Sequence, residues 1–170
     1  MDVLWNRGEE IYAPLSEAQR HARPVENKWT IAEEFDHVVR ANALFTSALK
    51  QDEQFYAQFG TVDKAPMTRT ELIDLYNSRL EEFSGSGTVR PFKPTPIEDL
   101  DSKSMLHFWE LTSQKFQERL SKRWSEELLD TRFVPHPLLG KLIAREIMYF
   151  IIHHTRHHID SLERKVKALK

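Results

Sequence analysis

The chain has 170 residues, of which 40% are hydrophobic and 29% are charged, a balance that is ordinary for one globular domain. The formal net charge of −2 shows no basic bias of the kind that accompanies binding to nucleic acid or to an anionic membrane surface. The chain has no cysteine, which excludes disulfides, thiolate zinc sites and a cysteine nucleophile.

The first two predicted helices are marked by their boundary residues. One helix is predicted over about residues 3–21, ending before Pro24. The next begins with a capping box, in which Thr30 and Glu33 can satisfy each other's backbone N–H groups ahead of an apolar run. This second helix is predicted to extend to about residue 59.

Three further helices are predicted at about residues 69–84, 98–124 and 141–169 from their apolar spacing. A proline-rich connector at 88–96 and the stretch FVPHPLLG separate them. Few runs alternate with period two, so strands are not expected. We therefore predict an all-α fold, an up-and-down four-helix bundle with an additional shorter helix, forming a single domain over the whole chain.

No segment is expected to enter a membrane. The start, MDVLWNRGEEIY, lacks the basic residues and following apolar run of a signal peptide. The longest apolar stretch, around residues 147–152, is far shorter than the roughly 20 residues that a spanning helix needs. We therefore expect a cytoplasmic protein, with no membrane partner and no nucleic-acid partner.

Four of the eight histidines lie in the run HHTRHH of the last predicted helix. On a helical wheel with about 100° per residue, His154 and His158 fall about 40° apart in the middle of the apolar stripe. His153 and His157 fall at its edge and are weak ligand candidates. Because His154 and His158 are one turn apart on one face, their two imidazoles can bind the same ion.

A third ligand should come from another helix, since catalytic zinc-type sites usually take three protein ligands and keep one position open. His37 is the best candidate, because apolar residues cover so much of its helix that the helix must touch several neighbours. The alternatives are that His37 is a hydrogen-bonded core residue and that the H-x-x-x-H pair occurs by chance. The remaining histidines lie near element ends, among polar residues or in a proline-bounded loop, and are weaker candidates: His21, His107 and His136.

Carboxylates near the candidate ligands in sequence are possible supporting groups. Metal-bound histidines usually donate their second N–H to a carboxylate or a carbonyl. Glu34, Asp36 and Asp160 lie near the candidate ligands in sequence, but we expect each to be solvated surface charge. Arg156 could hold a substrate carboxylate, and we expect Trp29 to close the corner between the first two helices.

Two segments resemble motifs of the DinB superfamily. KWTIAEEFDHVVRAN is similar to the opening motif, in which a tryptophan followed by Ser or Thr leads into a helix with a metal-binding histidine, and His37 has that position. HPLLGKLIAREIMYFIIHHTRHHIDSL resembles the last motif, in which a His-Pro and a glycine precede a helix with an H-x-x-x-H pair. The HTRHH form also looks like the YfiT-type branch, which places the metal on His154 and His158.

The resemblance implies a four-helix bundle with an open metal site, often in a homodimer. It favours a metal-dependent S-transferase that activates a low-molecular-weight thiol, such as bacillithiol or mycothiol, and acts on a small-molecule substrate. The alternatives are a metal-dependent hydrolase of a small molecule and a non-catalytic metal-binding or stress-response protein. The three-histidine set suits one divalent metal, Zn, Ni, Fe or Mn, and no residue beyond the ligands has a predicted catalytic role.

Overall fold

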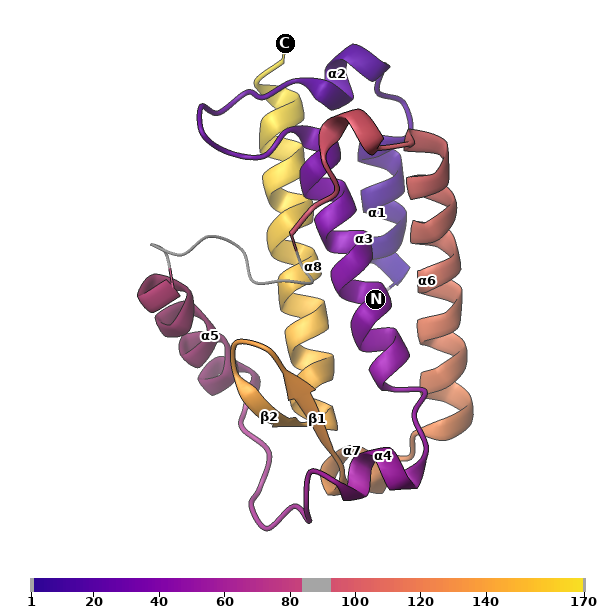
Figure 1. The fold of residues 1–170 in the computed structure, drawn as a ribbon, viewed down its shortest axis with the longest axis vertical. Coiled ribbons are helices and arrows are strands. Elements are labelled where there is room, and N and C mark those ends of the chain that lie inside the picture. Colours follow the sequence, from indigo (N-terminus) through magenta and orange to yellow (C-terminus); the bar gives the residue numbers. More distant parts are fainter. Residues whose placement is uncertain (1, 84–92, 170) are drawn as a thin grey trace.

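A computed structural model describes residues 2–83 and 93–169 (Figure 1). The described part is mostly helical, which confirms the all-α prediction. The helices are α1 (Asp2–Tyr12), α2 (Glu17–His21), α3 (Ile31–Ala48), α4 (Glu53–Ala57), α5 (Arg69–Phe83), η1 (Ile97–Asp99), α6 (Ser102–Arg123), α7 (Glu126–Thr131) and α8 (Ala144–Lys167), and the strands are β1 (Phe133–His136) and β2 (Gly140–Ile143).

Four long helices form the bundle. α3 contacts α6 and α8, and α1 contacts the same two helices, so α1 and α3 lie on opposite corners. In Figure 1, α3 and α6 run in one direction while α1 and α8 run in the other. α4 and α5 come between α3 and α6 in the chain, and η1 precedes α6 at the end of the bundle where α3 begins. α5, the additional helix, packs outside the bundle against α8.

α3 is the central helix of this arrangement. Twelve of its 18 residues are buried, and they contact α2, α6 and α8. A capping box fixes its first turn: Glu33 N–H donates to Thr30 Oγ1 at 3.1 Å, and Thr30 N–H donates to a Glu33 carboxylate oxygen at 2.7 Å. The predicted start of this helix is confirmed, and so is the prediction that it contacts several neighbouring helices.

Two predicted helices are each divided in two. The predicted helix over 3–21 is interrupted after Tyr12, because Pro14 cannot continue an α-helix and disfavours the helical conformation of the residue before it. The predicted extension of the second helix to residue 59 is also wrong, since α3 ends at Ala48. Asp52 then caps α4 by accepting a hydrogen bond from a backbone N–H.

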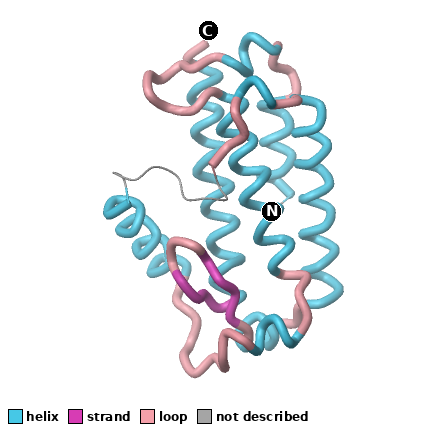
Figure 2. The backbone as a smooth tube through the Cα atoms, in the orientation of Figure 1, coloured by secondary structure: helices cyan, strands magenta, loops and turns pink. Residues whose placement is uncertain are grey.

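The expectation of no strands is wrong at FVPHPLLG, which is part of a two-stranded antiparallel hairpin (Figure 2). Gly140, the first residue of β2 after the turn, has a φ of +75°, a conformation that glycine adopts readily. Nδ1 of His136 accepts hydrogen bonds from the backbone N–H groups of Leu138 and Leu139, at 3.2 and 3.0 Å. The histidine side chain therefore closes the turn. Two strands of four residues, one of which contains Pro135, carry too weak a pattern for prediction.

None of the helices in the described ranges has the length and apolar character needed to cross a membrane.

α1 approaches α6 and α8 closely at Gly8. A Cβ atom at this position would lie 2.5 Å from Trp109 Cζ2 and 2.9 Å from Ile159 Cδ1. We expect Gly8→Ala to lower the free energy of unfolding by about 1–3 kcal/mol, the usual cost of overpacking, although alanine favours a helix by about 1 kcal/mol. Urea unfolding measures the change. Glu9→Ala, at an exposed site on α1, should change stability by less than about 0.5 kcal/mol, and a Gly8→Ala protein as stable as the native one would contradict this packing.

Candidate metal centre

Three histidines from two helices converge in the interior of the bundle. His37 lies on α3, and His154 and His158 lie on α8. One nitrogen from each ring forms a group whose members all lie within 4.8 Å of one another. The three residues are 5%, 4% and 9% exposed. The antiparallel contact between α3 and α8 thus brings together residues that are more than 100 positions apart in the chain.

The donor set fits a divalent ion. Nε2 of His37 lies 3.1 Å from Nε2 of His154. Zn–N bonds of about 2.0–2.1 Å place two tetrahedral ligands about 3.3 Å apart, so this separation is close to that of two ligands of one ion. Burial, followed by the proximity of His158 and His37, lowers the pKa of His154 well below its usual value. The imidazole is therefore neutral and keeps a lone pair that a metal can use.

Glu34 orients His158. Its Oε1 lies 2.9 Å from Nδ1 of His158, and because a carboxylate only accepts hydrogen bonds, Nδ1–H must donate. In a neutral imidazole with its proton on Nδ1, the lone pair resides on Nε2. Burial raises the pKa of Glu34, but hydrogen bonds from His158 and Lys165 outweigh burial and lower this pKa to about 2. Glu34 is only 4% exposed, so the prediction that it is solvated surface charge is wrong.

The other two candidate supporting carboxylates do not contact the three histidines. Asp36 is 7% exposed and accepts a hydrogen bond at 2.7 Å from the backbone N–H of Thr95. It therefore anchors the segment before α6, and the prediction that it is solvated surface charge is wrong. Asp160 is partly exposed and pairs with Arg7 at 2.9 Å, in agreement with the predicted surface role. Arg156 is exposed.

Trp29, which was predicted to close the corner between the first two helices, also contacts the histidine cluster. Its ring centroid lies 4.7 Å from that of His37 and 6.3 Å from that of His158. The partly buried indole therefore packs on two rings of the cluster, a contact that sequence reasoning missed. His153 is partly buried and His157 is exposed, as their positions at the edge of the apolar stripe predicted, and neither belongs to the three-histidine group.

The remaining histidines lie elsewhere. His21 and His107 are exposed. His136 is 5% exposed, and burial lowers its pKa to about 4. Its ring stacks on Phe45 and meets Phe150 edge to face, with centroids 5.3 and 4.4 Å apart. This neutral histidine has a structural place in the hairpin.

A buried amide and hydroxyl pair joins α3 to α8 beside the cluster. Asn42 Nδ2 donates to Thr155 Oγ1 at 3.1 Å, and Thr155 Oγ1 lies 3.2 Å from Asn42 Oδ1. Each residue satisfies the other in an apolar setting, where an unpaired polar group would be costly. The pair therefore favours one register between the two helices that carry the histidines. Polar residues on otherwise apolar helix faces are the sequence signal that could have identified it.

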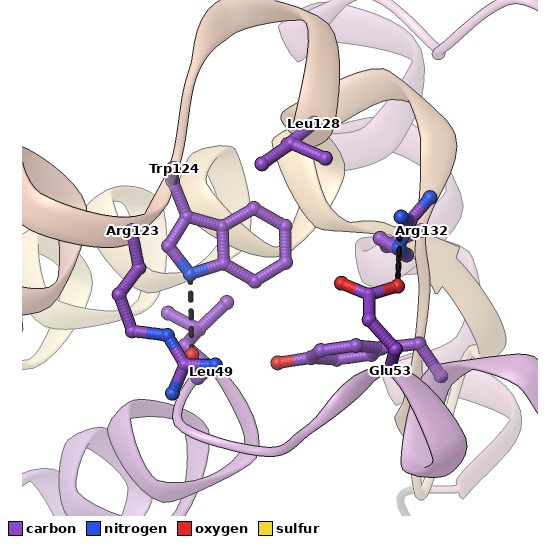
Figure 3. Close-up of a pocket in the computed structure, with 7 residues that line it drawn as sticks. Leu49, Glu53, Arg123, Trp124, Leu128 and Arg132 are labelled. Carbon is purple, nitrogen blue, oxygen red and sulfur yellow. Dashed lines mark hydrogen bonds and ion pairs between the residues drawn. The ribbon is translucent and has the colours of Figure 1, made fainter.

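A hollow of about 30 Å³ lies near the far end of α3 and shares no residue with the histidine cluster (Figure 3). Its polar groups are engaged within the protein. Trp124 Nε1 donates to the backbone carbonyl of Leu49 at 3.1 Å, Arg132 pairs with Glu53 at 2.7 Å, and Arg123 donates to the carbonyl of Gln51 at 3.1 Å. These contacts satisfy the end of α3 and the segment after it, so we assign the hollow a structural role.

The comparisons with known proteins agree with these observations. A sequence model of the DinB superfamily matches residues 1–161. The match includes the first motif segment, all but the last residue of the second, and the three histidines of the cluster. No curated protein and no solved structure matched the chain.

Proposed function

Because the chain belongs to the DinB superfamily and its three buried histidines could hold a metal ion, we propose that it is a metal-dependent S-transferase. In this proposal it activates a low-molecular-weight thiol and transfers it to a small electrophilic substrate. The observation that carries the proposal is the convergence of His37, His154 and His158, three imidazole donors with no carboxylate in their group.

His37, His154 and His158 would hold the ion and leave a position for an exchangeable ligand. A divalent ion bound by three neutral ligands keeps its full charge and lowers the pKa of a thiol or water that it binds, which supplies a nucleophile near neutral pH. Glu34 fixes the tautomer of His158 through a 2.9 Å contact. The Trp29 ring, packed on two of the imidazoles, shields their faces from water.

The engagement of Glu34 supports a thiol over water as the nucleophile. A thiol has a pKa of about 8.5 and water one of about 15.7, so water needs far more activation. Many hydrolytic sites add a carboxylate as general base. Here one oxygen of Glu34 contacts His158 and the other lies 2.6 Å from Lys165. This carboxylate is therefore committed to orienting groups and is not available to accept a proton from water.

A thiol-dependent assay tests this function. Metal-loaded protein should join the sulfur of a low-molecular-weight thiol to the halogen-bearing carbon of a halogenated nitroaromatic, with release of the halide ion and the thiol proton. A chelator should abolish the reaction. His158→Ala should reduce turnover to background, whereas His157→Ala, at the exposed neighbouring position, should retain it. Ester or amide cleavage without thiol would instead identify a hydrolase. Stoichiometric metal binding with background rates in both assays would identify a non-catalytic metal-binding protein.

A further inference from the structure

Lys165, near the end of α8, is buried to an extent that lysine rarely reaches. The residue is 7% exposed, and lysine is almost never fully buried unless it is paired. Its Nζ lies 2.6 Å from Glu34 Oε2 and donates a hydrogen bond at 2.5 Å to the backbone carbonyl of Trp29. The single ammonium group therefore joins the end of α8 to both the entry and the first turn of α3.

Both partners of Lys165 contact the histidine cluster. Glu34 receives the Nδ1–H of His158 through its other oxygen, so Lys165, Glu34 and His158 form one continuous chain of polar contacts. Trp29 packs its ring on His37 and His158. By holding Glu34 and Trp29 in place, the ammonium group would influence the orientation of the histidines without contacting them.

A neighbouring ion pair shows how unusual this arrangement is. Lys167 pairs with Glu163 on the same helix, but those side chains are 70% and 32% exposed, and such pairs contribute little. The side chains of Lys165 and Glu34 are 8% and 5% exposed. Burying both charges is costly, and apolar replacements of a buried pair are often as stable. Fold stability alone is thus a weak reason for a lysine at this position, and orientation of a functional group is a stronger one.

We propose that Lys165 is a positioning residue of the metal centre. It holds the Glu34 carboxylate in the orientation that accepts Nδ1–H of His158, which leaves Nε2 of His158 with its lone pair for the metal. The inference rests on the proposed metal binding. It adds to the metal centre a residue that contacts none of the three histidine ligands directly. Removal of the ammonium would free Glu34 to rotate and would let His158 adopt the other tautomer.

Metal affinity, measured by competition with a chromogenic zinc chelator, tests this role. Lys165→Met should weaken zinc binding about tenfold, within the range of about 10–100-fold known for groups that orient metal ligands. Lys167→Met, the matched exposed control, should bind like the native protein. In a Glu34→Gln background, Lys165→Met should add less than about a twofold change, because residues that act through one another are not additive.

Nitrogen NMR of the histidine rings in metal-free protein gives a second readout. We expect His158 to carry its proton on Nδ1 in the native protein and to populate both tautomers in Lys165→Met. If Lys165→Met does not fold, Lys165→Leu, which also lacks an N–H donor, provides the same comparison. Native affinity and an unchanged tautomer in a folded variant would overturn the proposal, as would additive effects with Glu34→Gln. Native protein that binds no zinc would refute the proposed function, while the tautomer comparison would still decide whether Lys165 orients His158.

Discussion

Replacement of His154 by alanine is expected to remove the bound metal and leave the bundle folded. Native protein purified without a histidine tag should contain about one equivalent of divalent metal, since three ligands are the usual minimum for an open site. With two ligands left, stoichiometric binding should be lost. Alanine is the best helix former, so α8 should persist. Elemental analysis measures the metal, and circular dichroism measures the retained helix.

The controls separate this site from a general affinity of histidine-rich sequence for metal. His153→Ala and His157→Ala alter the same HHTRHH run but lie outside the buried group, so both should retain native metal content. Loss of metal in these variants together with retention in His154→Ala would contradict the assignment. If the native protein is purified without metal and takes up neither Zn nor Ni, the three histidines are residues of the core and not metal ligands.

The metal-free protein is expected to lose stability as the pH falls from about 6.5 to about 4, with His136 as one cause. Burial lowers the pKa of His136 from 6.5 to about 4 in the folded state. Between these values the unfolded imidazole binds a proton that the folded one does not, so acid favours unfolding. The stabilisation present above pH 6.5 is therefore lost on acidification, and a shift of this size corresponds to about 3 kcal/mol.

His136→Asn isolates this contribution. The asparagine side-chain carbonyl can still accept hydrogen bonds from nearby turn N–H groups, but it does not titrate. Urea unfolding in the presence of a chelator at pH 7 and at pH 4.5 should show a loss on acidification that is about 2–3 kcal/mol smaller in the variant. His107→Asn, at an exposed position, should keep the native pH dependence. Equal losses in the native protein and His136→Asn would show that His136 is protonated in the folded state.

Local patterns were sufficient for several features of this protein. The capping box of Thr30 and Glu33 places the start of α3, because its two hydrogen bonds join residues only three apart. The helical period places His154 and His158 on one buried face and His153 and His157 at its edge. These properties follow from the geometry of a single helix, which is the same wherever the helix is packed.

Element ends were less predictable. The break after Tyr12, the separation of α4 from α3 and the short β-hairpin each depend on a few residues whose local preferences are weak. For His136, sequence alone indicated a proline-bounded loop, while the folded chain makes its ring nitrogen the acceptor that closes a turn. Tertiary contacts decide such short elements because they have little stability of their own.

The surroundings of the histidines were decided by tertiary structure alone. Sequence left His37 as a candidate among alternatives, and only the packing of α3 on α8 brings it to 3.1 Å from His154. Glu34 was expected at the surface because carboxylates usually are, yet it lies between His158 and Lys165, a residue 131 positions further along the chain. A helical period determines which side chains share a face, but which faces meet depends on how separate helices pack, and this is not encoded in either helix by itself.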